Sequence, residues 1–192
     1  IFNFEGAVKY AWMKEYYPAQ YEEMKKFIES GRWHISGASW DATDTLVPSI
    51  ESAIRNIMLG QDYYRKEFGV ESTDIFLPDC FGFGWTLPAI ASHCGLIGFS
   101  SQKLQWRNKP FYGNDKYPFT VGLWQGIDGS TIMMTHGYDY NQRFEDGDLS
   151  ENKDLLELTG HSPLHMVYRY YGTGDIGGSP TLESVRAVEK GL

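Results

Sequence analysis

The sequence predicts an α/β fold built on a parallel sheet. Segments with apolar residues at helical spacing alternate with short apolar runs of strand length along the 192 residues. The connections are short, which is typical of strands joined by crossover helices. The length suits one domain with a hydrophobic core, and the pattern shows neither an internal repeat nor a domain boundary.

The first part of the chain carries the clearest alternation. Residues 5–30 are predicted to form a helix, and residues 32–40 alternate like a strand. A second helix is expected to begin after Ser49 and to end at Gly69, because these residue types cap helices. Residues 73–79 then form a short apolar run of strand length.

The middle of the chain continues this pattern and then departs from it. A short helix is predicted at 86–94 and a strand at 96–101. Two strand-like runs within 119–137 flank Asp128–Gly129, which predicts a hairpin.

The last third is less regular. The polar and acidic stretch 141–154 is predicted to be a surface loop, and 164–172 is predicted to be a strand. A final helix is expected with Ser179 as its N-cap and Pro180 at its first position.

Composition excludes some functions and favours one. Aromatic residues make up 16% of the chain, and aromatic faces bind sugar rings well, although an aromatic-rich core is an equal alternative. The net charge of −8 argues against nucleic acid as a partner, and no apolar segment is long enough to span a membrane. The two cysteines are expected to be free thiols, which leaves the compartment open.

Polar and acidic residues recur just after the predicted strands. Because the carboxyl ends of parallel strands face one rim, these residues are candidates for one site. They are Asp41, Asp44, Asp79, Gln102, Lys103, Tyr138, Asp139 and Asp175.

Asp79 and Asp175 are the two carboxylates in the most unusual surroundings. Asp79 is followed by Phe81, Phe83 and Trp85, whose rings lower the local dielectric, although an Asp here also suits a turn or a helix cap. Asp175 lies among glycines, which allow close approach to a ligand and equally make turns. Two such carboxylates suggest glycoside hydrolysis.

Four motifs then point to one family. The segments "GRWHISGASWDATDTLVPSIESAIRN", "LPDCFGFGWTLPAIASHCGLIGFSSQKLQW", "GLWQGIDGS" and "YYGTGDIGGSPT" together resemble the catalytic domain of glycoside hydrolase family 38, the α-mannosidases, in its bacterial and cytosolic branch. The resemblance runs in order from about residue 5 to the end of the chain. It implies a seven-stranded parallel β/α barrel, here incomplete, so that residues 1–192 are part of a catalytic domain in a longer protein.

The resemblance also implies a chemistry and roles for individual residues. It implies retaining, zinc-dependent hydrolysis of α-mannosides in oligosaccharides or N-glycans, with Asp79 as nucleophile and zinc ligand and Asp175 as candidate general acid/base. Ile176 and Ser179 depart from the family's glycines and put the loop geometry at Asp175 in question. The residues implied in sugar binding are Trp40, Asp44, Phe81, Lys103, Tyr138 and Asp139.

The implied zinc site is not complete in this sequence. The family's other ligands are a His-x-Asp pair and a further His, and no segment of this chain matches them. We therefore expect the chain alone to hold zinc poorly, to be inactive, and to self-associate through exposed sheet edges. Two alternatives stay open: a catalytically silent carbohydrate-binding homologue, and a polysaccharide deacetylase-like enzyme.

Overall fold

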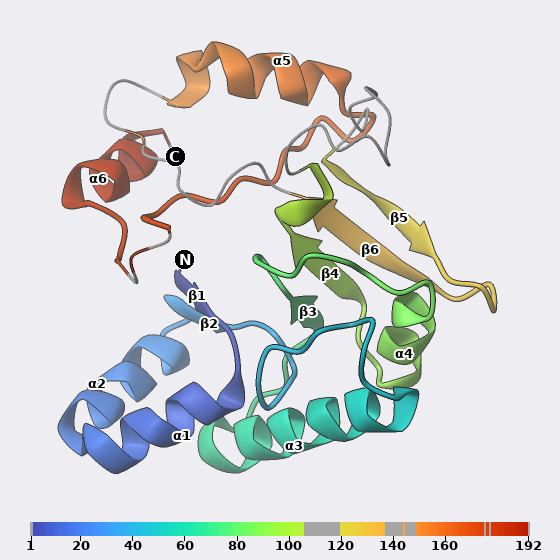
Figure 1. Ribbon diagram of the computed structural model, residues 1–192. Helices are drawn as coiled ribbons and strands as arrows, with labels where there is room; N and C mark the ends of the chain where they lie inside the picture. Colours follow the sequence, from blue (N-terminus) through green and yellow to red (C-terminus); the bar gives the residue numbers. More distant parts are fainter. Residues whose placement is uncertain are drawn as a thin grey trace. The chain divides into compact units, whose positions relative to one another are not determined.

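The computed structural model describes residues 2–105, 120–136, 144, 149–174, 176 and 178–191 of the chain (Figure 1). Helices and short strands alternate along it, which confirms the α/β class. The chain divides into two compact units, one of Ile1–Ser100 with Leu123–Met133 and one of Ser101–Gly122 with Met134–Leu192. Within the described part, no helix is both long and apolar enough to cross a bilayer.

Two parallel strand pairs form the framework of the first unit. Strand β1 (Phe2–Phe4) pairs with β2 (Trp33–Ile35), and β3 (Asp74–Phe76) pairs with β4 (Gly98–Ser101). Both pairs are parallel, as the alternation of helices and strands predicted. Strand β1 is so short that its sequence gave no strand signal of its own.

The predicted strand at 32–40 is shorter than expected because its second half bonds to Asp74 instead of continuing a ladder. The Ala38 amide donates to the Asp74 carbonyl at 2.9 Å. The Ser36 hydroxyl and the Gly37 amide donate to the Asp74 carboxylate at 2.6 and 2.9 Å. The segment after β2 therefore runs alongside the start of β3 and links the two strand pairs.

The single helix predicted for 5–30 is in fact two helices, α1 (Ala7–Tyr16) and α2 (Pro18–Glu29). The break lies at Tyr17, whose backbone is non-helical, with φ −136° and ψ 58°. A residue before proline is disfavoured in helical conformation, so Pro18 ends the first helix and begins the second.

Helix α3 (Ile50–Phe68) begins and ends where the sequence predicted. The Ser49 hydroxyl accepts a hydrogen bond from the Ser52 amide, and Gly69 closes the helix in the left-handed conformation at φ 67°. Midway along the helix, a Cβ built on Gly60 would lie 2.1 Å from the Ala38 carbonyl oxygen. The helix backbone therefore packs directly against the segment that follows β2.

Aromatic side chains build much of the first unit's core. Tyr10, Tyr21 and Tyr64 are almost fully buried among apolar residues. The Trp33 indole donates to the Tyr10 hydroxyl at 3.0 Å, and that hydroxyl donates to the Phe4 carbonyl at 3.0 Å. A large part of the aromatic content thus serves packing, which is the alternative that composition left open.

A hairpin extends the β3–β4 pair into a four-stranded sheet, the second of the two sheets. Strands β5 (Val121–Gln125) and β6 (Thr131–His136) are neighbours in the order β3-β4-β6-β5. Their turn is closed by a 2.8 Å bond from the Gly126 amide to the Ser130 carbonyl, with Gly129 at φ 87°. This confirms the predicted hairpin.

The second unit differs more from the expectation. Its described elements are η1 (Lys103–Gln105), η2 (Leu149–Glu151), α5 (Lys153–His161) and α6 (Leu182–Lys190). The prediction of a loop over 141–154 is wrong for its described end, where η2 and the start of α5 lie. The acidic run contains the N-cap of α5, Asn152, whose side chain accepts a hydrogen bond from the Leu155 amide at 3.1 Å.

Two further predictions in this unit are wrong. Residues 164–172 form no strand, because the chain there finds no ladder: the Tyr168 amide donates instead to the Thr120 hydroxyl at 3.3 Å. Helix α6 begins at Leu182, and Thr181 rather than Ser179 is its N-cap, accepting from the Ser184 amide at 3.2 Å.

Candidate functional site

Asp79 lies where strand β3 ends. The Leu77 amide still bonds to the Ser100 carbonyl at 3.0 Å, but Pro78 has no amide hydrogen and the ladder stops there. Helix α4 (Leu87–His93) begins eight residues after Asp79. The carboxylate is exposed at the carboxyl end of the strand, which is where the sequence predicted it.

The segment after Asp79 is bonded to the loop that follows β2. The Thr45 hydroxyl donates to the Gly82 carbonyl at 2.7 Å, and the Cys80 thiol lies 3.8 Å from the Thr43 carbonyl. A Cβ on Gly84 would lie 3.1 Å from the Thr45 carbonyl oxygen, so the two backbones approach closely. We call 43–47 and 80–86 the paired loops.

Asp44 has a structural use within the first of these loops. Its Oδ1 accepts hydrogen bonds from the Leu46 amide at 2.7 Å and from the Val47 amide at 3.1 Å. This arrangement is a side-chain-closed turn, which Asp commonly makes. The predicted sugar-binding residue therefore holds the conformation of its own loop.

Trp40 and Phe81 have different surroundings. The Trp40 ring is half-buried and packs edge-on against Tyr63, with ring centroids 5.8 Å apart. Phe81 is mostly exposed, while Phe83, two residues on, packs edge-on against Phe99 at 5.0 Å. The loop thus alternates between outward and inward rings, and Phe81 is on the outward side with Asp79.

An ion cluster, of which the sequence analysis named only Asp41, joins the residue after β1, helix α1 and the loop that follows β2. The Lys9 ammonium is 3.0 Å from Asp41 Oδ1 and 3.4 Å from Glu5 Oε1. Burial raises the pKa of the Glu5 carboxyl above its ordinary value, and the Lys9 ammonium only partly opposes this effect. Glu5 could have been found from the rule of carboxylates after strands had β1 been recognised.

The remaining predicted residues lie in the second unit. Lys103 opens η1, and its amide donates to the Ser101 hydroxyl at 3.1 Å. Tyr138, Asp139 and Asp175 lie outside the described residues, so their predicted roles stay predictions.

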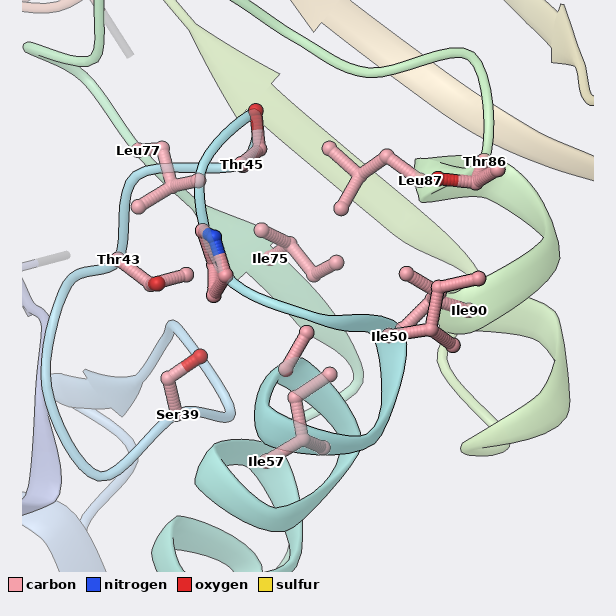
Figure 2. Close-up of a pocket in the computed structure, with 12 residues that line it drawn as sticks. Ser39, Thr43, Thr45, Ile50, Ile57, Ile75, Leu77, Thr86, Leu87 and Ile90 are labelled. Atoms are coloured by element: carbon pink, nitrogen blue, oxygen red, sulfur yellow. The ribbon is translucent and has the colours of Figure 1, made fainter.

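A cavity lies beneath the paired loops (Figure 2). Its walls combine hydroxyls such as those of Thr43 and Thr45 with apolar side chains such as Leu77 and Ile90. Its volume of about 40 Å³ holds roughly three water molecules and not a sugar ring. None of the predicted site residues lines it, so it is a packing gap and not the candidate site.

The described residues do not form a closed metal site. Among them, no group of three or more His, Cys, Asp or Glu side chains could hold a metal ion together. Zinc in proteins usually takes three or four such ligands. Asp79 could supply one carboxylate oxygen, and the described residues offer no set that completes it.

Comparison with protein families gives a match over nearly the whole chain. The model for the glycosyl hydrolases family 38 N-terminal domain matches residues 2–190. Alpha-mannosidase G of Dictyostelium discoideum is 37% identical over 191 residues, covering 96% of this chain and 16% of that protein. Alpha-mannosidase 2C1 of Homo sapiens is 29% identical over 187 residues, covering 94% of this chain and 17% of that protein.

Solved structures are similar in fold. A family 38 glycosyl hydrolase from Enterococcus faecalis superposes with a TM-score of 0.65 at 14% identity, covering 99% of this chain and 20% of that one. A 4-alpha-glucanotransferase from Thermococcus litoralis gives 0.68 at 16% identity, covering 98% of this chain and 29% of that one. The chain thus spans about a sixth of the length of the curated relatives it matches.

Proposed function

The chain belongs to the glycosyl hydrolase family 38 N-terminal domain family, and from this membership we propose that the whole protein hydrolyses α-mannosidic bonds in mannose-containing glycans. The observation that carries the proposal is the family match over residues 2–190. An exposed carboxylate, Asp79, at the carboxyl end of β3 supports it, because ligands of parallel α/β folds bind at that end of the strands.

The proposal includes the architecture. Residues 1–192 are part of one catalytic domain, and the parallel strands belong to a seven-stranded β/α barrel. The hydrogen bonds from Ser36, Gly37 and Ala38 to Asp74 support this, because they place β1, β2, β3 and β4 in sequence order. Sequence order of neighbouring strands is what successive βα units of a barrel produce.

The chemistry we propose is retaining hydrolysis with two carboxyl groups. Asp79 attacks the anomeric carbon, and the bond to the leaving oxygen breaks as that oxygen takes a proton from Asp175. Water then attacks the glycosyl-enzyme ester, giving its proton to Asp175 and releasing Asp79. In retaining enzymes such a pair stands about 5 Å apart, which lets one carboxylate attack while the other transfers the proton.

Aromatic rings are proposed to contact the sugar. Phe81 offers an exposed ring beside Asp79, and Trp40 offers the part of its ring that Tyr63 leaves open. The polar contacts we propose are made by Asp44, Lys103, Tyr138 and Asp139.

The zinc proposal is limited to one ligand in this chain. The described residues do not fit a complete zinc site, so Asp79 alone is assigned, with the other ligands supplied from elsewhere in the whole protein. When bound, zinc would supply a positive charge beside the sugar hydroxyls. Elemental analysis of the whole protein and of Asp79→Asn tests this: the variant should lose most of its zinc.

The experiment on activity compares the whole protein with two variants on an aryl α-mannoside. Asp79→Asn should lower kcat by at least about a thousandfold, because an amide is no nucleophile for the anomeric carbon. Asp62→Asn is the matched control, since Asp62 pairs with Lys66 on the surface of α3, and it should keep full activity.

Two results would contradict the proposal. Full activity of Asp79→Asn would remove the assigned nucleophile. A whole protein that binds α-mannosides but hydrolyses none of them would instead favour a silent carbohydrate-binding homologue.

A further inference from the structure

Trp85 is the most exposed aromatic side chain of the segment that carries Asp79. Its indole is 80% exposed, six residues beyond Asp79. Leaving a large apolar ring in water forgoes the stabilisation that burial would give. An exposed ring held near a catalytic carboxylate is therefore a candidate for ligand contact.

The backbone around Trp85 is hydrogen-bonded. The Thr45 hydroxyl donates to the Gly82 carbonyl at 2.7 Å, just before Trp85, and the bond from the Leu87 amide to the Gly84 carbonyl at 3.1 Å spans Trp85. The inward ring of Phe83 is anchored against Phe99. Trp85 thus stands on a hydrogen-bonded loop, so little ordering of the backbone would be needed when a ligand binds.

The chemistry around Trp85 favours a neutral ligand with one apolar face. Residues 67–102 contain no Lys or Arg, so this segment itself offers no cationic side chain to a phosphate or carboxylate. Leu46, on the other paired loop, is also largely exposed, and its side chain lies close to Gly82 and Gly84. A pyranose ring is such a ligand, because it is neutral and its C–H face packs on an aromatic plane while its hydroxyls stay in water.

We infer that Trp85 stacks a second sugar ring, the one adjacent to the residue that is cleaved, and so makes the site prefer oligomannosides to simple mannosides. This inference rests on the proposed function. Six residues of extended chain span at most about 20 Å, which sets the upper limit on the distance from Asp79 to Trp85, and Trp85 is a separate contact from Phe81.

The test measures kcat/KM of the whole protein on two substrates, linear α-mannotriose and p-nitrophenyl α-mannoside. Trp85→Ala should lower the value for mannotriose about tenfold, as loss of one aromatic stacking contact does, and leave the aryl mannoside within about twofold. Trp85→Phe should recover part of the loss. Trp12→Ala is the matched control, because Trp12 is an exposed indole on α1, and both substrates should be unaffected.

The outcomes separate this inference from the proposed function. Equal losses on both substrates with a lower Tm would mean that Trp85 packs against the rest of the protein, and unchanged kinetics would mean that it has no role; either overturns the inference. If the protein hydrolyses neither substrate, calorimetric titration measures whether it binds mannotriose and whether Trp85→Ala weakens that binding. Binding that Trp85→Ala weakens tenfold supports the inference without hydrolysis, and absence of binding overturns both.

Discussion

Glu5 shows how one residue makes stability depend on pH. Its carboxyl is mostly buried after β1, and burial raises its pKa from the ordinary value of 4.5, with Lys9 opposing the shift. Between pH 4.5 and the raised folded pKa, the folded state binds more protons than the unfolded state. The contribution of Glu5 is therefore most favourable below pH 4.5 and is lost as the pH rises through this window.

Glu5→Gln should accordingly stabilise the protein at neutral pH. We expect the free energy of unfolding to rise by up to about 1 kcal/mol at pH 8 and to change little at pH 4, as measured by urea denaturation. Glu22→Gln removes an exposed charge on α2 and should show no such difference between the two pH values. A loss of stability at pH 8 would mean that the ion pair with Lys9 outweighs the burial.

At the scale of one element, Gly60 allows helix α3 to pack directly against the segment that follows β2. No side chain separates the helix from the Ala38 and Ser39 backbone, because a Cβ at Gly60 would lie 2.1 and 2.4 Å from their atoms. Gly60→Ala should therefore lower the free energy of unfolding by at least about 2 kcal/mol.

The matched control is Gly160→Ala, also inside a helix. A Cβ there meets nothing within 4 Å, so the substitution should stabilise α5 by up to about 1 kcal/mol. Thermal unfolding of both variants measures the difference. Equal effects at the two positions would contradict the direct backbone contact.

The elements that could be predicted are those whose signals are local. Helix α3 carries its caps in Ser49 and Gly69, and the hairpin carries its turn at Asp128–Gly129, so both were predicted from the sequence. A strand needs a partner, and local sequence does not supply one. Residues 164–172 alternate but find no ladder, whereas β1 is too short to show a pattern yet pairs with β2.

The candidate site divides in the same way. The position of Asp79 was predictable, because Pro78 and the end of an apolar run mark the end of a strand. The roles of two other carboxylates, those of Asp44 and Glu5, were not predictable. Asp44 closes a turn by accepting hydrogen bonds from backbone amides, and Glu5 is largely buried and pairs with Lys9. Neither set of partners can be predicted from the residue type.

For the whole molecule, the exposed edge of the second sheet matters most. In the described part of the chain, β5 ends the strand order, and Leu123 on it is largely exposed, as are Ile127 and Met133 nearby. Uncovered edges with apolar side chains pair readily with another chain. We therefore expect the 192-residue chain to self-associate through β5.

Sedimentation velocity over a range of concentrations tests this expectation. Leu123→Lys should weaken association about tenfold or more, because it removes a buried Leu from the contact and adds a charge to the edge. Leu59→Lys changes an exposed Leu on α3 and should leave association unchanged. A monomer at all concentrations, or equal effects of the two variants, would contradict an edge contact.

The hydrogen bond between Thr45 and Gly82 bears on how this chain can be recombined with its relatives. The two loops lie far apart in sequence, so a single crossover between residues 47 and 80 would separate them. A chimera that takes only 80–86 from another protein would combine Thr45 with a loop whose backbone need not present a carbonyl to the Thr45 hydroxyl. Chimeras should therefore exchange residues 43–47 and 80–86 together, so that both loops come from the same parent protein.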